Sequence, residues 1–597
     1  MAPAPLENNL FLGVDRSVLG RRWEVRPVDE VEVAALVDDG RISDAVGRVL
    51  VARGVKAFDA DNFLHPTLKA LMPDPSTLMD MDRAAARLAE AMRSGEKITV
   101  FGDYDVDGAT SSALLKRFFR SVGVEAGVYI PDRRAEGYGP NAPALLALQA
   151  EGTQVIITVD CGIVAFETLK VAQDAGLDVV VVDHHKAEAQ IPVAAAIVNP
   201  NRLDDTSGQG HLAAVGVAFL LVVAVNRVLR KSGWFVEKGI AEPDLRQWLD
   251  LVALGTVCDV VPLRGLNRAY VAQGLQVLKG GGNAGLKALS RIAQVDSHVT
   301  AFHLGYLLGP RVNAGGRVGQ ADIGARLLST DDADEAAALA IRLDEFNVSR
   351  KEIEAAVFRD ALEQAETNSN PDDPLIVVAG KDWHPGVIGI VAGRLKERCG
   401  VPVCVVALDG GMAKGSGRSV AGVDLGRAIA SARDAGHLFS GGGHAMAAGF
   451  TVEEQRLHAF TIFMQDEVKR QLQGEPFVAQ LNLDGALAAS AISLDLITEL
   501  DCVAPFGAGN DEPRFAVVDV KVGKATVVGS GHVRCFLSGR GGGHVKAIAF
   551  NSADSDLGRT LLTAAGRRMH IAGTVRVDNW QGRRGVQLII DDAAFAQ

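Results

Sequence analysis

The sequence has few features of a membrane-spanning, secreted or cysteine-rich protein. No apolar run in its 597 residues is long enough to cross a bilayer, and the longest, residues 212–225, is typical of a buried helix. The first residues do not combine a basic segment with a following apolar one, so we expect no secretion signal and a cytoplasmic location. None of the six cysteines belongs to a C-x-x-C pair, which argues against zinc ribbons and thioredoxin chemistry.

Positive charge is also in deficit. The formal net charge of −12 argues against a protein that coats DNA through a broad basic face. It is compatible with a nuclease, because carboxylates that hold metal ions make an active site acidic. The content of 48% hydrophobic and 22% charged residues is typical of a folded globular protein, and the length predicts three or four domains.

Three apolar segments in the first part of the chain alternate with amphipathic ones. The apolar segments are residues 97–102, 154–159 and 177–182, and helical patterns follow at 109–122 and 165–175. Continuous apolar strands separated by amphipathic helices are typical of a parallel sheet that helices cover on both faces.

The remainder of the chain shows two other patterns. Residues 331–366 are rich in alanine and charge and predict one long helix, or two, between domains. A second α/β region opens with the apolar segment 375–379 and extends to about residue 470. From Phe477 onward, about five short alternating segments separated by glycine and polar turns predict a small β-barrel of the OB type.

Acidic and imidazole side chains follow each of the three predicted strands. In chain order they are Asp103, Asp105 and Asp107, then Asp160, then Asp183, His184 and His185. Ligands bind outside the carboxyl ends of parallel strands, so these side chains should converge in one crevice. A divalent cation is the simplest remedy for their mutual repulsion.

Each of these residues has a simpler interpretation when taken alone. The segment DYDVDG resembles the start of an EF-hand loop, but its twelfth position is Leu114 rather than an acid, so a calcium loop is excluded. A single Asp after a strand usually forms a turn or caps a helix, and a single His usually packs in a core. Asp259, within the apolar stretch LVALGTVCDVVPL, is either a capping or ion-paired residue or, as we favour, a further ligand.

The ligand types indicate the metal and the reaction. Carboxylates and imidazoles without thiolates suit Mn²⁺ or Mg²⁺ better than a structural zinc. Five or six of them can hold two ions about 3.5–4 Å apart with a shared carboxylate. Such a pair activates water and neutralises charge on a phosphate, which predicts phosphodiester hydrolysis.

At these residues the sequence resembles the DHH phosphoesterase superfamily, which is named after the motif found here at 183–185. Within it, nearly the whole chain is similar to the RecJ family of single-strand-specific 5′→3′ exonucleases. The motifs that carry the resemblance include GDYDVDGATS, TVDCGI, LVALGTVCDVVPL, LGPRVNAGGR, KGSGRS, GGGHAMAAGF and PFGAGNDEPRF.

The resemblance implies a fold and a division into domains. The implied fold is α/β, with a parallel-sheet DHH domain joined by a long helix to a smaller α/β DHHA1 domain, followed by a C-terminal OB-like β-barrel. The expected parts are an N-terminal extension (1–45), the DHH catalytic domain (46–330), the connecting helix (331–370), the DHHA1 substrate-binding domain (371–472) and the OB-fold DNA-binding domain (473–597).

The resemblance also implies roles for the acids and imidazoles. The expected ligands of the two ions are Asp103, Asp105, Asp107, Asp160, His184 and Asp259. Asp160 would bridge both ions, and Asp160, His184 and His185 would form the catalytic set. His185 would contact the scissile phosphate or its water rather than a metal ion.

Candidate phosphate ligands lie in the second α/β region. Lys414, Ser416 and Arg418 supply hydrogen-bond donors suited to phosphate. By resemblance, Ser416 and Arg418 bind the 5′-terminal phosphate together with Arg133. The neighbouring Arg134 is the alternative to Arg133, because the segment PDRRAEGYG departs from the family pattern.

A glycine-rich segment ends in His444. Its glycines, including Gly442 and Gly443, either form a flexible turn or let the backbone approach a phosphate closely. The histidine that directly follows them favours the second interpretation.

Other candidate substrate contacts remain open between two interpretations. Arg311, Asn313 and Arg317 belong either to a solvated loop or to a loop that lines the DNA path. His384 follows Trp383, which either packs in a core or stacks on DNA. In the last domain Trp580 is a candidate for base stacking, although aromatic residues form only 5% of the chain.

The sequence therefore predicts a metal-dependent exonuclease that degrades single-stranded DNA from the 5′ end to 5′-mononucleotides. One alternative is a DHH phosphodiesterase acting on short oligonucleotides or cyclic dinucleotides. A non-catalytic DNA-binding relative is a third hypothesis, and the intact acidic set argues against it. The resemblance implies roles in DNA repair and recombination, with single-strand-binding protein and a RecQ-type helicase as partners.

Overall fold

The computed structural model places most of the chain in two compact units. It describes residues 10–38, 40, 42–133, 135–295, 299–368, 370, 373–473, 478–578 and 584–596. The first unit comprises residues 1–316, 320–343 and 480–597, and the second comprises 317–319 and 344–479. Among the described residues, no helix is long and apolar enough to span a membrane.

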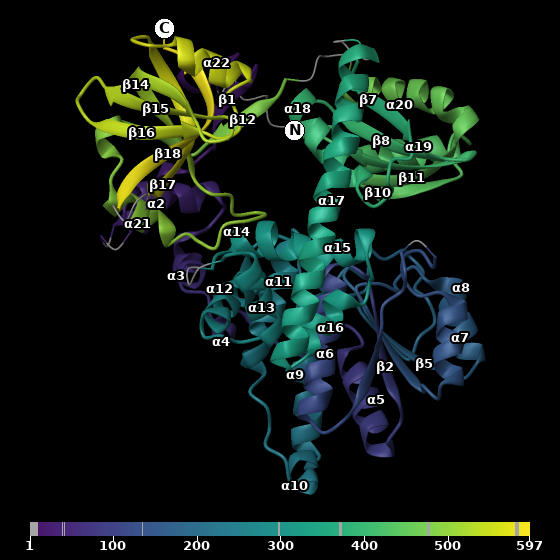
Figure 1. Ribbon diagram of the computed structural model, residues 1–597. Helices are drawn as coiled ribbons and strands as arrows, with labels where there is room; N and C mark the ends of the chain where they lie inside the picture. The colour runs from purple at the N-terminus through teal and green to yellow at the C-terminus, as the bar shows by residue number, and fades with distance from the viewer. Residues whose placement is uncertain are drawn as a thin grey trace, which may run out of the picture. The chain divides into compact units, whose positions relative to one another are not determined.

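The first unit contains a five-stranded parallel sheet (Figure 1). Its strands, in spatial order, are β3 (Ala126–Tyr129), β2 (Ile98–Gly102), β4 (Val155–Val159), β5 (Asp178–Val182) and β6 (Ala196–Val198). β2 and β4 are buried along their whole length, which explains their uninterrupted apolar sequences. The observed sheet confirms the predicted parallel arrangement.

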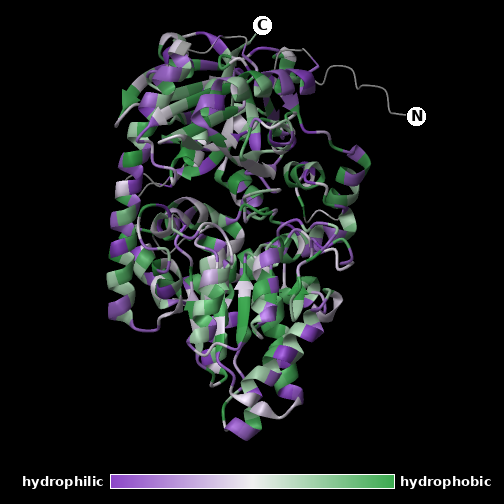
Figure 2. Ribbon diagram, turned by 90° about the vertical axis from the view of Figure 1, so that its right-hand side faces the viewer, coloured by the Kyte–Doolittle hydropathy of each residue, from purple (hydrophilic) through white to green (hydrophobic). Residues whose placement is uncertain are grey.

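Helices cover both faces of this sheet. The helices α7 (Ala142–Ala150) and α8 (Phe166–Asp174) share a hydrophobic core with β2, β4 and β5. The helices α5 (Met81–Ser94), α6 (Val106–Ser121) and α9 (Ala214–Lys231) contact other parts of the same sheet. Figure 2 shows hydrophobic residues gathered in the strands and hydrophilic residues on the surrounding helices.

A closed β-barrel forms the carboxyl-terminal part of the first unit. Its strands are β14 (Arg514–Val528), β15 (His532–Gly539), β16 (His544–Ala549), β18 (Gly585–Phe595) and β17 (Arg568–Asp578), with β13 (Gly485–Leu487) added beside β14. Pairing of β14 with β17 closes the ring, and α22 (Asp556–Thr563) precedes β17. This barrel confirms the OB-like domain expected from the alternating segments.

Residues near the N-terminus pack on this barrel. Strand β1 (Arg22–Val25) pairs in parallel with β12 (Gln480–Leu483). The indole Nε1 of the buried Trp23 and the hydroxyl of Ser17 both donate to Asp592 Oδ2, at 3.2 and 2.7 Å. The helices α1 (Glu30–Val37) and α2 (Asp44–Ala52) add hydrophobic residues to the barrel core.

A buried arginine ties the barrel to the helices beside the parallel sheet. Arg268, in α12 (Gly265–Lys279), donates to the carbonyls of Phe63, Val503, Ala504 and Pro505 and lies 3.8 Å from the centre of the Phe63 ring. Burial lowers the pKa of Arg268 to about 10, still above physiological pH. The guanidinium thus stays charged while four carbonyl oxygens take the place of water.

The second unit has a five-stranded mixed sheet. In spatial order the strands are β10 (Ser440–His444), β11 (Ala447–Glu453), β9 (Met412–Arg418), β8 (Val403–Asp409) and β7 (Ile376–Lys381). Its helices are α18 (Ile388–Cys399), α19 (Leu425–Asp434) and α20 (Leu457–Gln471). The predicted long helix is α17 (Ala333–Asn368), which joins the two units along the chain.

Shorter helices connect these elements, together with five further 3-10 turns: η1 (Phe11–Gly13), η2 (Ala57–Asp59), η3 (Pro75–Thr77), η6 (Glu454–Arg456) and η7 (Ala489–Ala491). The shorter helices are α3 (Ala60–Leu64), α4 (Leu68–Leu71), α10 (Trp234–Lys238), η4 (Leu245–Trp248), α11 (Leu249–Cys258), α13 (Ala284–Ile292), α14 (Ala301–His303), η5 (Leu304–Leu308), α15 (Gly309–Val318), α16 (Ile323–Ser329) and α21 (Leu494–Asp501).

Candidate metal centre

The register of the parallel sheet brings three acids together. Gly102 lies opposite Val159, and Val159 lies opposite Val182, so β2, β4 and β5 end at the same level. The next residue after each strand is an aspartate: Asp103, Asp160 and Asp183. Asp160 has a left-handed backbone with φ of 61°, a conformation that aspartate tolerates better than most residues.

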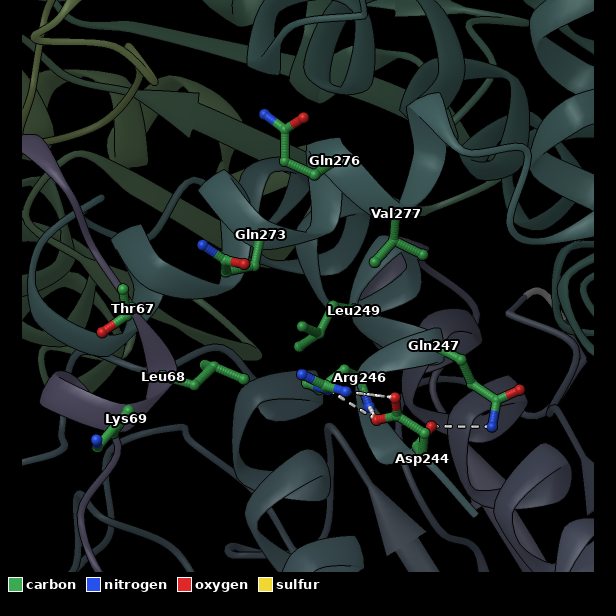
Figure 3. Close-up of a pocket in the computed structure, with 10 residues that line it drawn as sticks. All are labelled: Thr67, Leu68, Lys69, Asp244, Arg246, Gln247, Leu249, Gln273, Gln276 and Val277. Carbon is green, nitrogen blue, oxygen red and sulfur yellow. Dashed lines mark hydrogen bonds and ion pairs between the residues drawn. The ribbon is translucent and has the colours of Figure 1, made fainter.

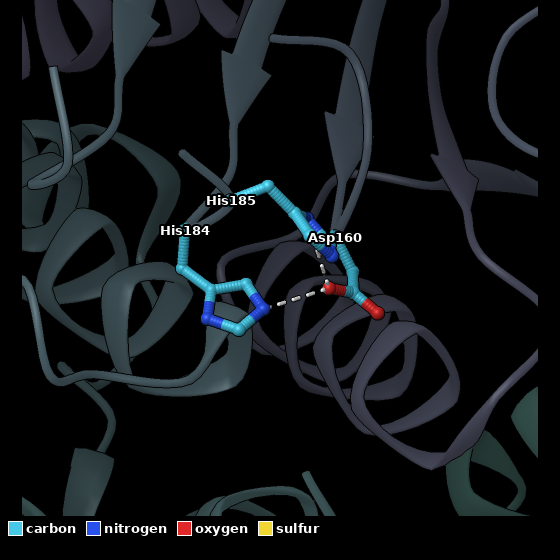
Figure 4. Close-up of side chains that lie close together, drawn as sticks. All are labelled: Asp160, His184 and His185. Atoms are coloured by element: carbon cyan, nitrogen blue, oxygen red, sulfur yellow. Dashed lines mark ion pairs between the residues drawn. The ribbon is translucent and has the colours of Figure 1, made fainter. Parts of the chain in front are cut away.

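All six predicted ligands lie around one space in the first unit. The His184 Nε2 atom lies 3.3 Å from Asp160 Oδ1, 3.6 Å from Asp259 Oδ2 and 3.9 Å from Asp107 Oδ2. Figure 4 shows the His184 and His185 rings next to each other, and dashed lines join one nitrogen of each ring to the Asp160 carboxylate. One ligand atom each from Asp103, Asp105 and Asp160 also lies within 4.8 Å of the others.

The polar atoms that face this space lack partners among the described residues. Asp103 Oδ1, Asp160 Oδ1, Asp259 Oδ2 and His184 Nε2 are all buried without a hydrogen bond. His184 Nδ1 lies 3.1 Å from the Leu212 carbonyl, which can only accept, so Nδ1 carries the proton and Nε2 presents its lone pair. Unpaired buried carboxylates cost several kcal/mol each, and oxygen and imidazole donors fit a divalent cation.

Burial and mutual repulsion also shift the pKa values of the residues in this cluster. Burial, and then repulsion from Asp105, raises the pKa values of Asp103 and Asp160 well above the ordinary range. Burial also raises the pKa of Asp107 to about 7 and lowers that of His184 to about 4. His184 is therefore neutral at physiological pH, as a metal ligand must be.

Three of these acids lie at helix ends. Asp107 accepts hydrogen bonds from the backbone N–H groups of Ala214 and Val215, at 2.6 and 2.9 Å, at the start of α9. Asp105 caps α6 by accepting from two backbone N–H groups, so the simpler interpretation of this residue as a cap also holds. Asp259 follows the last residue of α11 and caps its C-terminus.

Asp183 does not face the cluster but orients the loop that does. It accepts hydrogen bonds from the backbone N–H groups of Ile163, His184 and His185 and lies 2.7 Å from His185 Nδ1. Although burial opposes it, the Asp183 hydrogen bond raises the pKa of His185. The His185 side chain is 37% exposed, so it is an oriented imidazole that solvent or a ligand can reach.

Two tyrosines beside the cluster were not among the predicted site residues. The Tyr138 hydroxyl donates to the Asp160 carbonyl at 3.0 Å, and its ring meets those of His185 and Tyr104 edge-on. The guanidinium of Arg133 lies 5.0 Å from the centre of the Tyr104 ring. A tyrosine between two glycines in EGYG is the signal that could have drawn attention to Tyr138. Arg134 lies outside the described residues.

The phosphate-binding candidates of the second unit share one face of β9. Lys414, Ser416 and Arg418 occupy alternate positions, so their side chains point to the same side of the sheet. Arg418 Nη1 lies 3.2 Å from Ser416 Oγ, and both side chains approach Gly389 in the first turn of α18. Burial lowers the pKa of Arg418.

The glycine-rich segment is an edge strand and not a turn before a helix. Residues 440–444 form β10, in which Gly442 lies opposite Gly449, itself opposite Ser416 on β9. Gly443 has a φ of 155°, and a Cβ at this position would lie 2.4 Å from the Ala447 carbonyl oxygen. Close backbone approach between β10 and β11 therefore requires this glycine, and His444 at the strand end is exposed.

The remaining predicted contacts have varied surroundings. Arg311 and Asn313 lie on the helix α15, so the expectation of a loop there was wrong. Arg317 Nη1 donates to the Gly386 carbonyl at 2.9 Å, and His384 Nδ1 accepts from the Gly386 N–H at 3.0 Å. Trp383 is buried, which favours its interpretation as a core residue. Trp580 lies outside the described residues.

A pocket of about 540 Å³ in the first unit is lined by none of the predicted site residues. Its described lining comes from α4, η4 and α12 and the residues beside them (Figure 3). The oppositely charged Asp244 and Arg246 in its wall pair with each other at 2.7 Å. The pocket therefore offers no charge pattern that identifies a ligand.

Comparisons with known proteins agree with this arrangement. Residues 97–256 match the DHH family N-terminal domain, residues 372–470 the DHHA1 domain and residues 483–592 the RecJ OB domain. The chain is 36% identical to the single-stranded-DNA-specific exonuclease RecJ of Escherichia coli, over 91% of this chain and 95% of that protein. It is 34% identical to RecJ of Bacillus subtilis, over 96% and 71%.

Solved structures give the same result. The crystal structure of RecJ from Thermus thermophilus in complex with Mn²⁺ superposes with a TM-score of 0.79 and 30% identity, covering 96% of this chain and 79% of that one. The Mg²⁺ complex of RecJ from the same organism gives a TM-score of 0.75 and 29% identity, with the same coverage.

Proposed function

Because this chain belongs to the RecJ family, we propose that it is a metal-dependent exonuclease specific for single-stranded DNA, which it degrades from the 5′ end. The observation that supports this proposal most directly is the convergence of six acidic and imidazole residues, four of which have a buried polar atom without a described hydrogen-bond partner. Hydrolysis of the phosphodiester bond would release 5′-mononucleotides.

The acidic cluster would hold Mn²⁺ or Mg²⁺ through Asp103, Asp105, Asp107, Asp160, His184 and Asp259. Bound divalent ions supply an activated water and neutralise charge on the phosphate. Asp160 is suited to a shared position, because its carboxylate lies near both His184 and the other acids. The bond from His184 to the Leu212 carbonyl keeps Nε2 deprotonated toward the ions.

His185 would act on the phosphate rather than on the ions. Its Nδ1 is held by Asp183, and the raised pKa favours the protonated ring. A protonated and partly exposed imidazole can donate to a phosphate oxygen and stabilise the negative charge that develops there. Tyr138, which contacts His185 and the Asp160 carbonyl, would limit the positions that these groups adopt.

Polarity would come from recognition of the 5′ phosphate. The face of β9 with Lys414, Ser416 and Arg418 offers cationic and hydroxyl donors, and Arg133 offers a guanidinium beside the metal centre. Further substrate contacts that we propose are Arg311, Asn313, Arg317, His384, Gly442, Gly443, His444 and Trp580. A cytoplasmic location, roles in repair and recombination, and partnership with single-strand-binding protein and a RecQ-type helicase belong to the same proposal.

Digestion of end-labelled DNA tests this function. A single strand labelled at its 5′ end should release labelled mononucleotide at once in the presence of Mn²⁺, whereas a 3′ label should stay on long products until late. A duplex of the same sequence and a reaction in EDTA are the controls. Early release of the 3′ label would refute the polarity. Hydrolysis of dinucleotides or cyclic dinucleotides without hydrolysis of long strands would favour the alternative function.

A further inference from the structure

Two aromatic rings stack on each other at the surface of the first unit. The Phe302 and Tyr306 rings lie 4.9 Å apart with an angle of 24° between their planes. The two residues are 49% and 72% exposed. Among the described residues, no other contacting pair of Phe, Tyr or Trp side chains is exposed at both members. Exposed aromatic surface of this kind often marks a binding site.

The helix that carries the two rings packs on α11 through other residues. Leu304 and Leu308 are fully buried, and Gly305 and Gly309 lie against the last turn of α11. The Cys258 thiol also lies 3.6 Å from the Leu304 carbonyl. This packing fixes the helix on α11, so the position of the aromatic pair does not depend on the pair itself.

The same packing connects the pair to the metal centre. Cys258, which contacts the helix of the pair, directly precedes Asp259, and the Asp259 carboxylate lies 3.6 Å from His184. The turn η5, which lies between α14 and α15, contacts α11. The aromatic pair therefore lies on a helix that packs against the helix preceding the predicted metal ligand Asp259.

The backbone beneath the pair is unusual. Residues 304–308 form a π-helical turn, and single π turns within α-helices frequently occur at functional sites. The turn leads into α15, where Arg311 Nη1 donates to the Leu307 carbonyl at 2.7 Å. This bond holds the Arg311 guanidinium at the residue that follows Tyr306. A nucleic acid carries both aromatic bases and phosphates, and the rings and the guanidinium suit these two groups.

We propose that Phe302 and Tyr306 form a platform on which bases of the single-stranded substrate stack. This inference rests on the proposed function and adds a base-binding site to it. Base–aromatic stacking is worth about 1–3 kcal/mol per base and does not depend on sequence, which suits an exonuclease. In a duplex the bases stack on their neighbours and do not offer their faces, so the platform favours single strands.

The test compares a variant without rings with variants that keep them. In EDTA, where no hydrolysis occurs, the double variant F302A/Y306A should bind a fluorescent oligothymidylate on the order of tenfold more weakly for each base that stacks. The exchange F302Y/Y306F keeps both rings and should bind like the wild type. Phe58, which is 82% exposed, provides F58A as the control for loss of an exposed ring elsewhere.

Two further measurements vary the length of the substrate and the position of a missing base. With Mn²⁺, F302A/Y306A should raise KM for long strands and leave kcat, and the hydrolysis of dinucleotides, within about twofold of the wild type. An abasic site moved along the strand should weaken wild-type binding at one or two positions, and the double variant should lose this dependence.

Several results would overturn the platform. They are wild-type affinity in the double variant, an equal loss with dinucleotides, or an abasic profile that the variant shares with the wild type. Binding of a protein partner that fails in the variant while DNA binding persists would also overturn it. If the wild-type protein neither binds nor degrades single strands, the proposed function fails before the platform is tested.

Discussion

Replacing Asp160 with asparagine should stabilise the metal-free protein and at the same time remove most of its response to Mn²⁺. The Asp160 carboxylate is buried, its Oδ1 has no described partner, and neighbouring carboxylates raise its pKa further. Asparagine keeps the shape of the side chain without its charge. It also tolerates the left-handed φ of 61° at this position, so the substitution changes little else.

The size of the effect follows from the geometry. One oxygen each of Asp103, Asp105 and Asp160 lies within 4.8 Å of the others. Two full charges at that separation repel by roughly 3.5 kcal/mol at an effective dielectric constant of about 20. Partial protonation of the cluster reduces this repulsion, so D160N should gain about 2–4 kcal/mol in EDTA. For a unit of roughly 450 residues, whose unfolding entropy is about 1 kcal/mol/K, the unfolding midpoint would rise by roughly 2–4 °C.

Thermal unfolding followed by fluorescence, in EDTA and in MnCl₂, measures both effects. Mn²⁺ should raise the midpoint of the wild type strongly and that of D160N only slightly. The variant D160A removes the same charge but costs about 1–2 kcal/mol in the left-handed conformation, so it should unfold below D160N. A D160N protein that is less stable than the wild type in EDTA, yet responds fully to Mn²⁺, would refute a metal-binding role for Asp160.

Three further predictions concern other residues. In EDTA, the free energy of unfolding should fall as pH rises from about 4 to about 7. The folded-state pKa of Asp107 is about 7 against 3.8 ordinarily, so the native state holds this proton more tightly than the unfolded chain. Mn²⁺ should flatten the dependence of unfolding free energy on pH, and a flat dependence in EDTA would contradict this account. R268M should cost on the order of 3 kcal/mol by leaving buried carbonyls unpaired and should speed amide exchange at Val503 and Ala504; unchanged exchange there would exclude the contact. Y104L should reduce the preference, measured as kcat/KM, for 5′-phosphorylated over 5′-hydroxyl strands, because Arg133 loses the ring against which it packs. Y104F keeps the ring and should keep the preference. The same preference in both variants would argue against a role of Tyr104 in positioning Arg133.

The metal centre could be predicted because the ends of neighbouring parallel strands can be located from sequence. Apolar strands of similar length end at one level of a parallel sheet, and the residue after each strand is then fixed in space. Asp103, Asp160 and the motif at 183–185 therefore met as expected. The sequence does not predict that Asp183 is the partner of His185, because it does not show in which direction each side chain of the motif points.

Glycine misled the prediction at LGPRVNAGGR. Its glycines predict a loop, but Gly309 and Gly316 lie in a helix, where a side chain would collide with neighbours. A Cβ on Gly316 would lie 2.8 Å from the Tyr104 carbonyl oxygen, so α15 approaches the first acidic motif closely only without one. Sequence shows that glycine is present, but not which contact requires it.

Contacts between distant parts of the chain were equally invisible. The division at 45, 330, 370 and 472 remains a prediction, whereas the structure groups residues 480–597 with the first 316 residues in one unit. That grouping depends on pairs such as Arg268 with the carbonyls at 503–505, for which no local pattern exists.

The pairing of β1 with β12 has a consequence during synthesis. Trp23 reaches its partner Asp592 only after 569 further residues have been added. At a ribosomal rate of about 5–20 residues per second, this takes roughly 30–110 seconds. For that interval a nascent chain carries an unsatisfied strand and an uncovered indole, so chaperone occupancy near the ribosome should be greatest on these first segments.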